Sequence, residues 1–440
     1  MRIAICSLSQ FAYVAESVDV AQRLNEKHEV RHFLGFACPD ALSLLQRKQV
    51  PYRVLSDEQI DIESIVTVPA AARSTYDLFA NGFFKQAELT LPALVEALRA
   101  WKPDLILSYL RDYAGMTAAE ILDVPMASFG SFPSPVRIEG LDPPYGAGVS
   151  QDAPPRLLQL MWKLHHEFNR RVDPLYNATI RRPYGLDDVC GVSTLHSHKL
   201  VLLGTIPVLS GKNSPDPPYV KYVGPLFSGN GAPAGADEPE KIARIASSPR
   251  PRVLLSLGTT YVGPLIVKCL QALLAFPGTV IVTLGSNRMD HHLAPLLERQ
   301  NVIWSPFFSD FKRVLELVDA VVTVTATKTA LASLAAGKPL VCVPQQGEQY
   351  EQAYQLQALG AAEVPCPRHW DAHTFASMTG QVATEHRYAR AASVLQAHVE
   401  RSGGVDEAVR LIDGTLAQVG NLRKETEAGL TCNGTTTGPR

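Results

Sequence analysis

Two polar clusters in the second half of the chain have residue types suited to binding a phosphorylated sugar. The first lies in a turn between an apolar run and a small-residue helix, and it contains Thr325, Thr327, Lys328 and Thr329. A helix that begins there would direct free N–H groups and the positive end of its dipole at a phosphate. The second is Glu348-Gln349, whose carboxylate can accept hydrogen bonds from vicinal sugar hydroxyls and whose amide can both donate and accept. The first cluster therefore suits a phosphate and the second a hexose; a solvent-exposed lysine and a polar loop that caps a helix are the alternatives.

The elements around these clusters are those of a parallel β-α-β unit. The apolar run Ala320–Val324 predicts a strand, and the small residues of about Thr327–Ala336 predict a helix. A second strand, Leu340–Val343, precedes the helix Gln349–Leu359. Open parallel sheets hold ligands at the carboxyl ends of their strands, which is where both clusters would lie.

The order of motifs in this region resembles the donor-binding half of the GT-B glycosyltransferases. The small-residue helix ends in Ala-Ala-Gly-Lys-Pro, the next strand ends in Val-Pro-Gln, and the helix after Glu348-Gln349 closes on Ala-Leu-Gly-Ala-Ala. The pattern is most similar to that of the nucleotide-sugar-dependent enzymes that make natural-product, macrolide and glucuronide glycosides. The resemblance implies an α/β fold of the GT-B type, in which two Rossmann-like doubly wound domains face a central cleft.

The chain divides at a polar stretch rich in turn residues. Residues 1–223 would form an N-terminal acceptor-binding domain, residues 224–250 a linker, and residues 251–385 a C-terminal nucleotide-sugar-binding domain. By the same resemblance, residues 386–420 would form helices that cross back to the first domain. The polar residues 421–440 predict a disordered tail.

Further donor-binding elements are implied by the resemblance. The strand that starts at Arg252 ends in the turn Gly258-Thr259-Thr260, whose glycine lets the backbone approach a phosphate and whose hydroxyls can donate. Phe307 or Phe308 would stack on a uracil or thymine, with Trp304 in reserve and a core aromatic as the alternative. The family places a histidine beside the pyrophosphate; Val324 stands there in this chain, and Lys328 would supply the missing charge.

The family's catalytic pattern is replaced in the first domain. The loop after the first strand, Arg2–Leu8, usually carries a histidine that deprotonates the acceptor, and Tyr13 occupies its place. Tyr109 replaces the aspartate that orients this histidine, although Asp112 follows three residues later. Tyr13 and Asp112 are the catalytic candidates. However, a tyrosine with an ordinary pKa near 10 is a poor base at neutral pH, and Asp112 could instead cap the helix that follows it.

Composition narrows the class of protein. The 440 residues are enough for two domains, and 46% hydrophobic with 19% charged residues is typical of a soluble globular protein. A net charge of −2 argues against a nucleic-acid partner.

The seven cysteines form no C-x-x-C pair, which indicates neither a disulfide framework nor a zinc site and fits the cytoplasm. No apolar stretch reaches the roughly 18 residues of a membrane span. No Asp-x-Asp motif is present, so we expect neither a metal nor another cofactor.

The resemblance implies a hexosyltransferase that inverts the anomeric carbon. It would move a hexose from a UDP or dTDP sugar to a small or amphipathic natural-product acceptor, without a metal ion; a homodimer is an open possibility. One alternative is a GT-B protein that has lost catalysis and acts as the partner or activator of another transferase. Another is a nucleotide-sugar enzyme whose acceptor needs no base, such as an acid that is already ionised, or water.

Overall fold

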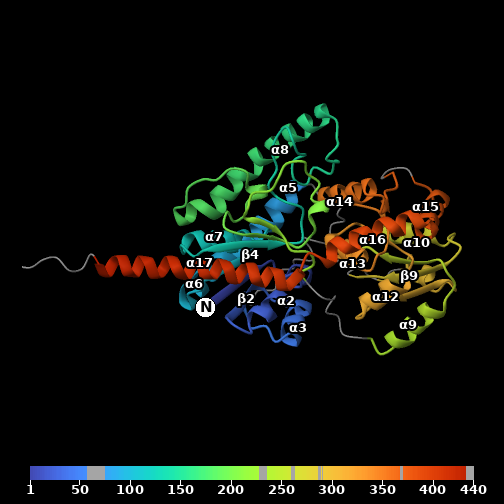
Figure 1. The fold of residues 1–440 in the computed structure, drawn as a ribbon, viewed down its shortest axis with the longest axis horizontal. Coiled ribbons are helices and arrows are strands. Elements are labelled where there is room, and N and C mark those ends of the chain that lie inside the picture. The colour runs from blue at the N-terminus through green and yellow to red at the C-terminus, as the bar shows by residue number, and fades with distance from the viewer. Residues whose placement is uncertain are drawn as a thin grey trace, which may run out of the picture.

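The chain folds into two α/β domains that pack side by side, as the N-terminal and C-terminal colours of Figure 1 show. The computed structural model describes residues 1–56, 75–226, 235–258, 263–285, 289, 291–366 and 370–432. Thr259 and Thr260, two of the predicted phosphate contacts, lie outside the described residues.

The first domain is built on a seven-stranded parallel sheet. Its strands are β1 (Arg2–Ser7), β2 (Glu29–Phe36), β3 (Tyr52–Ser56), β4 (Leu105–Tyr109), β5 (Met126–Gly130), β6 (Val201–Leu203) and β7 (Val220–Tyr222). They are ordered β3-β2-β1-β4-β5-β6-β7 across the sheet, and every neighbouring pair is parallel. The order therefore reverses between β1 and β4.

The second domain repeats this plan with six strands. They are β8 (Arg252–Ser256), β9 (Thr279–Thr283), β10 (Val302–Ser305), β11 (Ala320–Thr323), β12 (Leu340–Cys342) and β13 (Ala362–Glu363). Their order is β10-β9-β8-β11-β12-β13, again all parallel, so the reversal falls between β8 and β11. All five residues of β8 are buried, as expected for a strand covered by helices on both faces.

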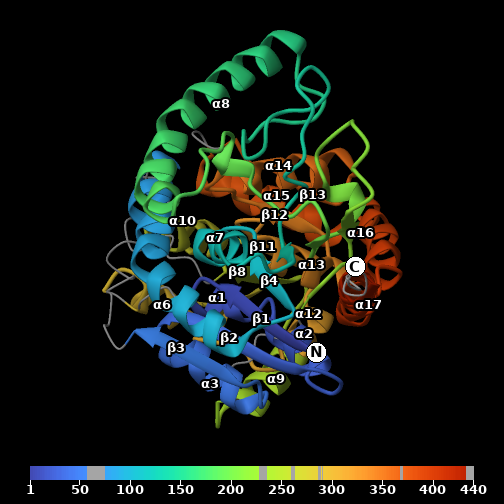
Figure 2. The same ribbon diagram turned by 90° about the vertical axis from the view of Figure 1, so that its left-hand side faces the viewer.

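Helices cover both sheets. In the first domain they are α1 (Phe11–Val14), α2 (Val18–Leu24), α3 (Pro39–Arg47), α5 (Thr75–Asp77), α6 (Lys85–Trp101), α7 (Tyr113–Ile121) and α8 (Pro155–Tyr176). In the second they are α9 (Glu238–Ser247), α10 (Pro264–Leu273), α11 (Ala294–Leu297), α12 (Phe311–Leu317), α13 (Thr327–Ala335), α14 (Gly347–Ala358), α15 (Ala372–Thr384) and α16 (His386–Glu400). Figure 2 shows α8 projecting beyond the body of the first domain. The predicted fold, two Rossmann-like doubly wound domains, is confirmed.

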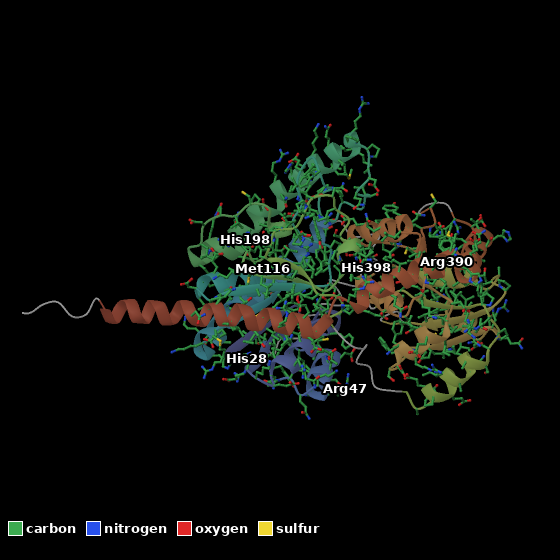
Figure 3. The ribbon with its side chains drawn as sticks, in the orientation of Figure 1. His28, Arg47, Met116, His198, Arg390 and His398 are labelled. Carbon is green, nitrogen blue, oxygen red and sulfur yellow. The ribbon has the colours of Figure 1, made fainter. Side chains whose placement is uncertain are left out.

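The last helix, α17 (Gly404–Cys432), returns to the first domain. Ile412 and Leu416 are buried in that domain's core, and Asp413 accepts a hydrogen bond from His28 at 2.9 Å. Figure 3 shows His28 beneath this helix. Helices that cross back to the first domain were expected from residue 386. However, α16 packs Leu395 and Val399 against α13 of the second domain, so only α17 crosses back.

Two predicted boundaries differ from the structure. Residues 238–247 of the expected linker form α9, which belongs to the second domain because Ile245 is in its core and Glu238 accepts hydrogen bonds from Ser309 and Asp310. Residues 421–432 of the expected tail continue α17, so the prediction of disorder is wrong there. In both places a polar composition indicated irregular structure, but an amphipathic or extended helix also tolerates many polar residues.

Two features are absent from the residues that the structure describes. None of their helices is both long and apolar enough to cross a membrane. No group of three or more His, Cys, Asp or Glu side chains among them is arranged to hold a metal ion.

The junction between the domains requires a glycine at position 224. Gly224 has a φ of +78°, and a Cβ built on it would lie 1.8 Å from Ser402 Oγ, just before α17. We expect Gly224→Ala to destabilise the protein through backbone strain of about 1–2 kcal/mol and steric overlap of about 1–3 kcal/mol. The free energy of unfolding, from denaturant titration, measures the loss.

Gly140→Ala is the matched control, because Gly140 has a φ of +88° but a Cβ built on it would meet nothing within 4 Å. It should show the backbone strain alone. Equal losses in the two variants would contradict close packing at Gly224.

Candidate donor and acceptor sites at the domain interface

Two turns of the second domain meet at the point where its strand order reverses. Gly258 follows β8 and Thr325 follows β11, and these two strands are neighbours. A Cβ built on Gly258 would lie 3.8 Å from the Cβ of Ala326, so the turns are in contact. This is where an open parallel sheet holds a ligand.

The amino end of α13 opens into this turn without a side-chain cap. Its N-cap residue is Ala326, which offers no acceptor to the first-turn amides. The Thr327 hydroxyl accepts a hydrogen bond from Gln352 Nε2 at 2.7 Å, and Thr329 lies partly exposed in the same turn. Uncapped amides at a helix start make a suitable anion site, as the sequence predicted.

Thr325 has an unusual backbone conformation. Its φ is +64°, a left-handed value that is strained for a β-branched residue. A glycine would adopt this φ without that strain. The side chain is fully buried, so Thr325 shapes the turn and does not present its hydroxyl to solvent.

Lys328 does not extend into the phosphate turn. Its Nζ donates a hydrogen bond to the Ala12 carbonyl and lies 3.6 Å from Glu16 Oε1, and both partners belong to the first domain. Glu16 is 5% exposed, and its other oxygen accepts the Ser131 amide at 2.8 Å. Burial lowers the pKa of Lys328 and raises that of Glu16. The predicted donor-binding lysine is therefore part of an interdomain ion pair.

Glu348 lies in the first turn of α14, facing the first domain. Burial raises the pKa of this carboxyl, and the positive charge of Arg111 in the first domain acts in the opposite direction. The neighbouring Gln349 accepts the Gln345 amide at 2.8 Å through its side-chain oxygen. Glu348 is thus available to a ligand, whereas Gln349 uses that oxygen to stabilise its own loop.

The first domain covers this corner of the site. A Cβ built on Gly347 would lie 1.8 Å from the Gly146 carbonyl oxygen, so the loop of the first domain lies directly on the start of α14. The Arg111 guanidinium lies over the Tyr145 ring, 5.0 Å from its centroid, and donates to the Ser193 carbonyl at 2.6 Å. These side chains place an aromatic and cationic wall opposite Glu348.

A buried ion pair closes the same corner. Arg137 donates to Glu351 at 3.2 Å, and the two side chains are 2% and 1% exposed. Arg137 also donates to the carbonyls of Ser210 and Gly211. Burial raises the pKa of Glu351 to about 7 although Arg137 opposes the rise.

The two tyrosines that stand where the resemblance implies a catalytic histidine and aspartate are in contact. The rings of Tyr13, in α1, and Tyr109, at the end of β4, have centroids 5.1 Å apart. Tyr109 is fully buried, and its hydroxyl has no hydrogen-bond partner among the residues that the structure describes. Burial raises its pKa well above the ordinary value. The strand reversal in the first sheet brings these residues together, as the resemblance implied for the pair that they replace.

Asp112 serves as the N-cap of α7. Its Oδ1 accepts the Gly115 amide at 3.2 Å, and the residue is 7% exposed. Burial raises its pKa to about 6. Its closest surroundings are Cys6 and Ser108, since a Cβ on Gly115 would lie 2.7 Å from atoms of all three side chains. The described contacts do not place Asp112 with Tyr13, so the alternative of a helix cap is the one that the structure supports.

The aromatic candidates for a nucleobase occupy different environments. Phe307 follows β10 and is 38% exposed, so it can offer a ring face to a base. Phe308 is fully buried in the core of the second domain with Leu254 and Ile281, so the expectation that it stacks a base is wrong. Trp304 borders a separate groove beside α9, where Lys241 lies 5.6 Å from its ring centroid.

Sequence reasoning did not identify four residues that define this interface. Arg111 and Glu351 lie beside the candidates Asp112 and Glu348-Gln349, and Glu16 and Arg137 lie in no motif that the sequence analysis used. Only the approach of two domains makes them partners. The sequence signal that could have found them is the presence of charged residues in segments that otherwise read as buried.

Comparison with known proteins agrees with this architecture. No family model matches the chain. Demethyllactenocin mycarosyltransferase of Streptomyces fradiae is 26% identical over 341 residues, which are 74% of this chain and 67% of that protein. Among solved structures, the glycosyltransferase of kitacinnamycin has a TM-score of 0.69 at 18% identity, covering 94% of this chain and 99% of its own. Glycosyltransferase VinC, solved in complex with dTDP, has a TM-score of 0.65 at 18% identity, covering 95% and 99%. The GT-B fold and the resemblance to natural-product glycosyltransferases are confirmed.

The contribution of the buried Arg137–Glu351 pair to the unfolding free energy should depend on pH. Arg137→Met leaves a buried carboxylate without its cation, which should cost about 3–5 kcal/mol of unfolding free energy at pH 8. Because the folded-state pKa of Glu351 is raised from 4.5 to about 7, the protonated form is tolerated. The loss should be smallest near pH 4.5 and grow as the pH rises through 7.

The double variant Arg137→Met/Glu351→Met should recover part of the loss, because neither charge remains buried. Arg182→Met is the control: it breaks the Arg182–Asp188 pair, whose side chains are 61% and 50% exposed, and should cost at most about 1 kcal/mol. A double variant less stable than Arg137→Met at pH 8 would contradict this account.

Proposed function

We propose that this protein is a glycosyltransferase that moves a hexose from a UDP or dTDP sugar to a small or amphipathic natural-product acceptor, with inversion at the anomeric carbon. The observation that carries the proposal is the uncapped start of α13 beside Gly258, at the strand reversal of the second sheet, with Glu348 on the next helix facing the first domain. A diphosphate at α13 would place its sugar toward Glu348.

Each part of the donor has a matching group. The amides of Thr327 and Thr329 and the backbone near Gly258 would bind the diphosphate, and the exposed ring of Phe307 would stack on the base. Glu348 would accept hydrogen bonds from sugar hydroxyls. The name of the mycarosyltransferase relative and the dTDP complex of VinC favour a dTDP sugar.

The reaction would be a direct displacement. The acceptor oxygen passes its proton to a base or to water and bonds to the anomeric carbon, and the bond to the diphosphate breaks with its electron pair leaving on the phosphate oxygen. The dipole and amides at the start of α13 would stabilise that charge, so the mechanism that we propose uses no metal ion.

A protein without catalysis, acting as a partner or activator, is the second candidate. The observation that favours it is the Tyr13–Tyr109 contact, since neither ring replaces a histidine–aspartate pair in function, and Asp112 is used as a helix cap. An acceptor that needs no base would also be compatible with these replacements.

The first test of the function is binding of a nucleoside diphosphate. Calorimetry with UDP and dTDP should show a dissociation constant of millimolar or tighter for at least one of them, because two turns and a helix start converge on the site. GDP serves as the comparison for base selectivity. Absence of binding by all three would reject a nucleotide-sugar enzyme.

The second test concerns the sugar contact of Glu348. Glu348→Ala removes charge-assisted hydrogen bonds worth about 1.5–3 kcal/mol each, so the affinity for the sugar nucleotide should fall at least tenfold. The affinity for the free diphosphate should stay the same, because the carboxylate touches only the sugar in this proposal. Glu348→Gln should give an intermediate loss. Equal losses for diphosphate and sugar nucleotide would show that Glu348 only stabilises its loop.

A further inference from the structure

The ion pair between Glu16 and Lys328 connects the acceptor domain directly to the proposed diphosphate site. Lys328 is the second residue of α13, where the helix dipole disfavours a positive charge. Its ammonium is nevertheless held there, 3.6 Å from Glu16 and bonded to the Ala12 carbonyl. Lys328, which lies in the first turn of α13, therefore forms an ion pair with a carboxylate of the opposite domain.

Glu16 is held in one place and is adjacent to the replaced catalytic pair. The Ser131 amide fixes one of its oxygens at 2.8 Å, and the other faces Lys328. Its charge acts on Tyr109, whose ring contacts Tyr13 and whose hydroxyl has no hydrogen-bond partner in the described part of the chain. Glu16 thus lies between the diphosphate turn of one domain and the strand reversal of the other, the place where the two substrates must meet.

We propose that Glu16 is the group that takes the proton from the acceptor hydroxyl, and that the donor diphosphate activates it by drawing Lys328 away. The inference rests on the proposed function. A diphosphate at the start of α13 offers Lys328 more negative charge than one carboxylate, and the lysine stem is flexible enough to turn to it. Glu16 then remains buried without its cation, which makes it a stronger base.

In the proposed step the acceptor O–H bond breaks and its proton moves to Glu16. The acceptor oxygen forms a bond to the anomeric carbon, and the diphosphate leaves with the electron pair of the bond that it loses. The proton passes from Glu16 to water after the products leave. The lysine that leaves Glu16 would stabilise the new charge on the diphosphate, so donor binding and base activation are one event.

The test separates proton transfer from binding by comparing turnover with diphosphate affinity. Glu16→Gln keeps an acceptor for the Ser131 amide but cannot take a proton at neutral pH. We expect its kcat to fall about 10²–10⁴-fold, the loss typical of a missing general base. Its affinity for UDP or dTDP should be equal to that of the unmodified protein or several-fold tighter, because Lys328 is no longer held by a carboxylate. Retained diphosphate binding also shows that the variant is folded.

Glu26→Gln is the control, since Glu26 forms an exposed ion pair with Arg23 in the same domain. It should change neither quantity. Turnover of Glu16→Gln within tenfold of the unmodified protein would overturn the inference, and so would a matching loss in diphosphate affinity, which would indicate a structural role. Failure of the unmodified protein to bind any diphosphate would instead reject the proposed function.

Should Glu16→Gln not fold, Lys328→Met gives an independent measurement. Among the described residues, the charged group that faces Glu16 is Lys328 on α13. The titratable side chain near it is Tyr109 on β4. Loss of the lysine raises the pKa of Glu16 in the free enzyme, so the acidic limb of the kcat/KM profile should move to higher pH. The diphosphate affinity should fall as well. An acidic limb that stays in place would overturn the inference.

Discussion

Two buried charge pairs between the domains determine how the site is built. Glu16 with Lys328, and Glu351 with Arg137, each join a carboxylate to a cation from the other domain. A carboxylate removed from water is unfavourable unless a cation and hydrogen bonds replace the lost hydration. Each domain therefore supplies what the other domain's buried charge requires. These charged groups are kept away from water only while the domains are packed together.

The parallel sheets decide which segments reach that interface. In both sheets the strand order reverses beside the first strand, and the loops at the carboxyl ends of the two adjacent strands lie side by side there. Tyr13 meets Tyr109 for this reason in the first domain, and Gly258 meets Ala326 in the second. The two reversal points face each other across the interface, so a donor on one side and an acceptor on the other would be neighbours.

At the strand reversal of the first sheet, Tyr13 and Tyr109 lie against each other. These two rings lie where the resemblance implied a polar pair, and the hydroxyl of Tyr109 is buried with no hydrogen-bond partner among the described residues. Burial disfavours its ionised form, so at neutral pH this hydroxyl is ionised even less than that of an exposed tyrosine. Glu16 is three residues beyond Tyr13 in sequence and reaches the interface from the same loop region.

The sequence by itself determined the fold, the two domains, the turns at Gly258 and Thr325, and the position of Glu348, because each depends on local patterns of apolar strands, glycine turns and helix starts. It did not determine the partners of Lys328, and it left open whether Asp112 caps a helix and which of Phe307 and Phe308 is buried. The two neighbours Phe307 and Phe308 are identical in type, and only the packing of the second sheet sets one outward and the other inward. Likewise Lys328 follows a phosphate-binding pattern, yet a carboxylate more than 300 residues earlier in the chain is its partner. Local periodicity carries no information on which surfaces of two separately folded domains come together, and tertiary packing alone made that choice.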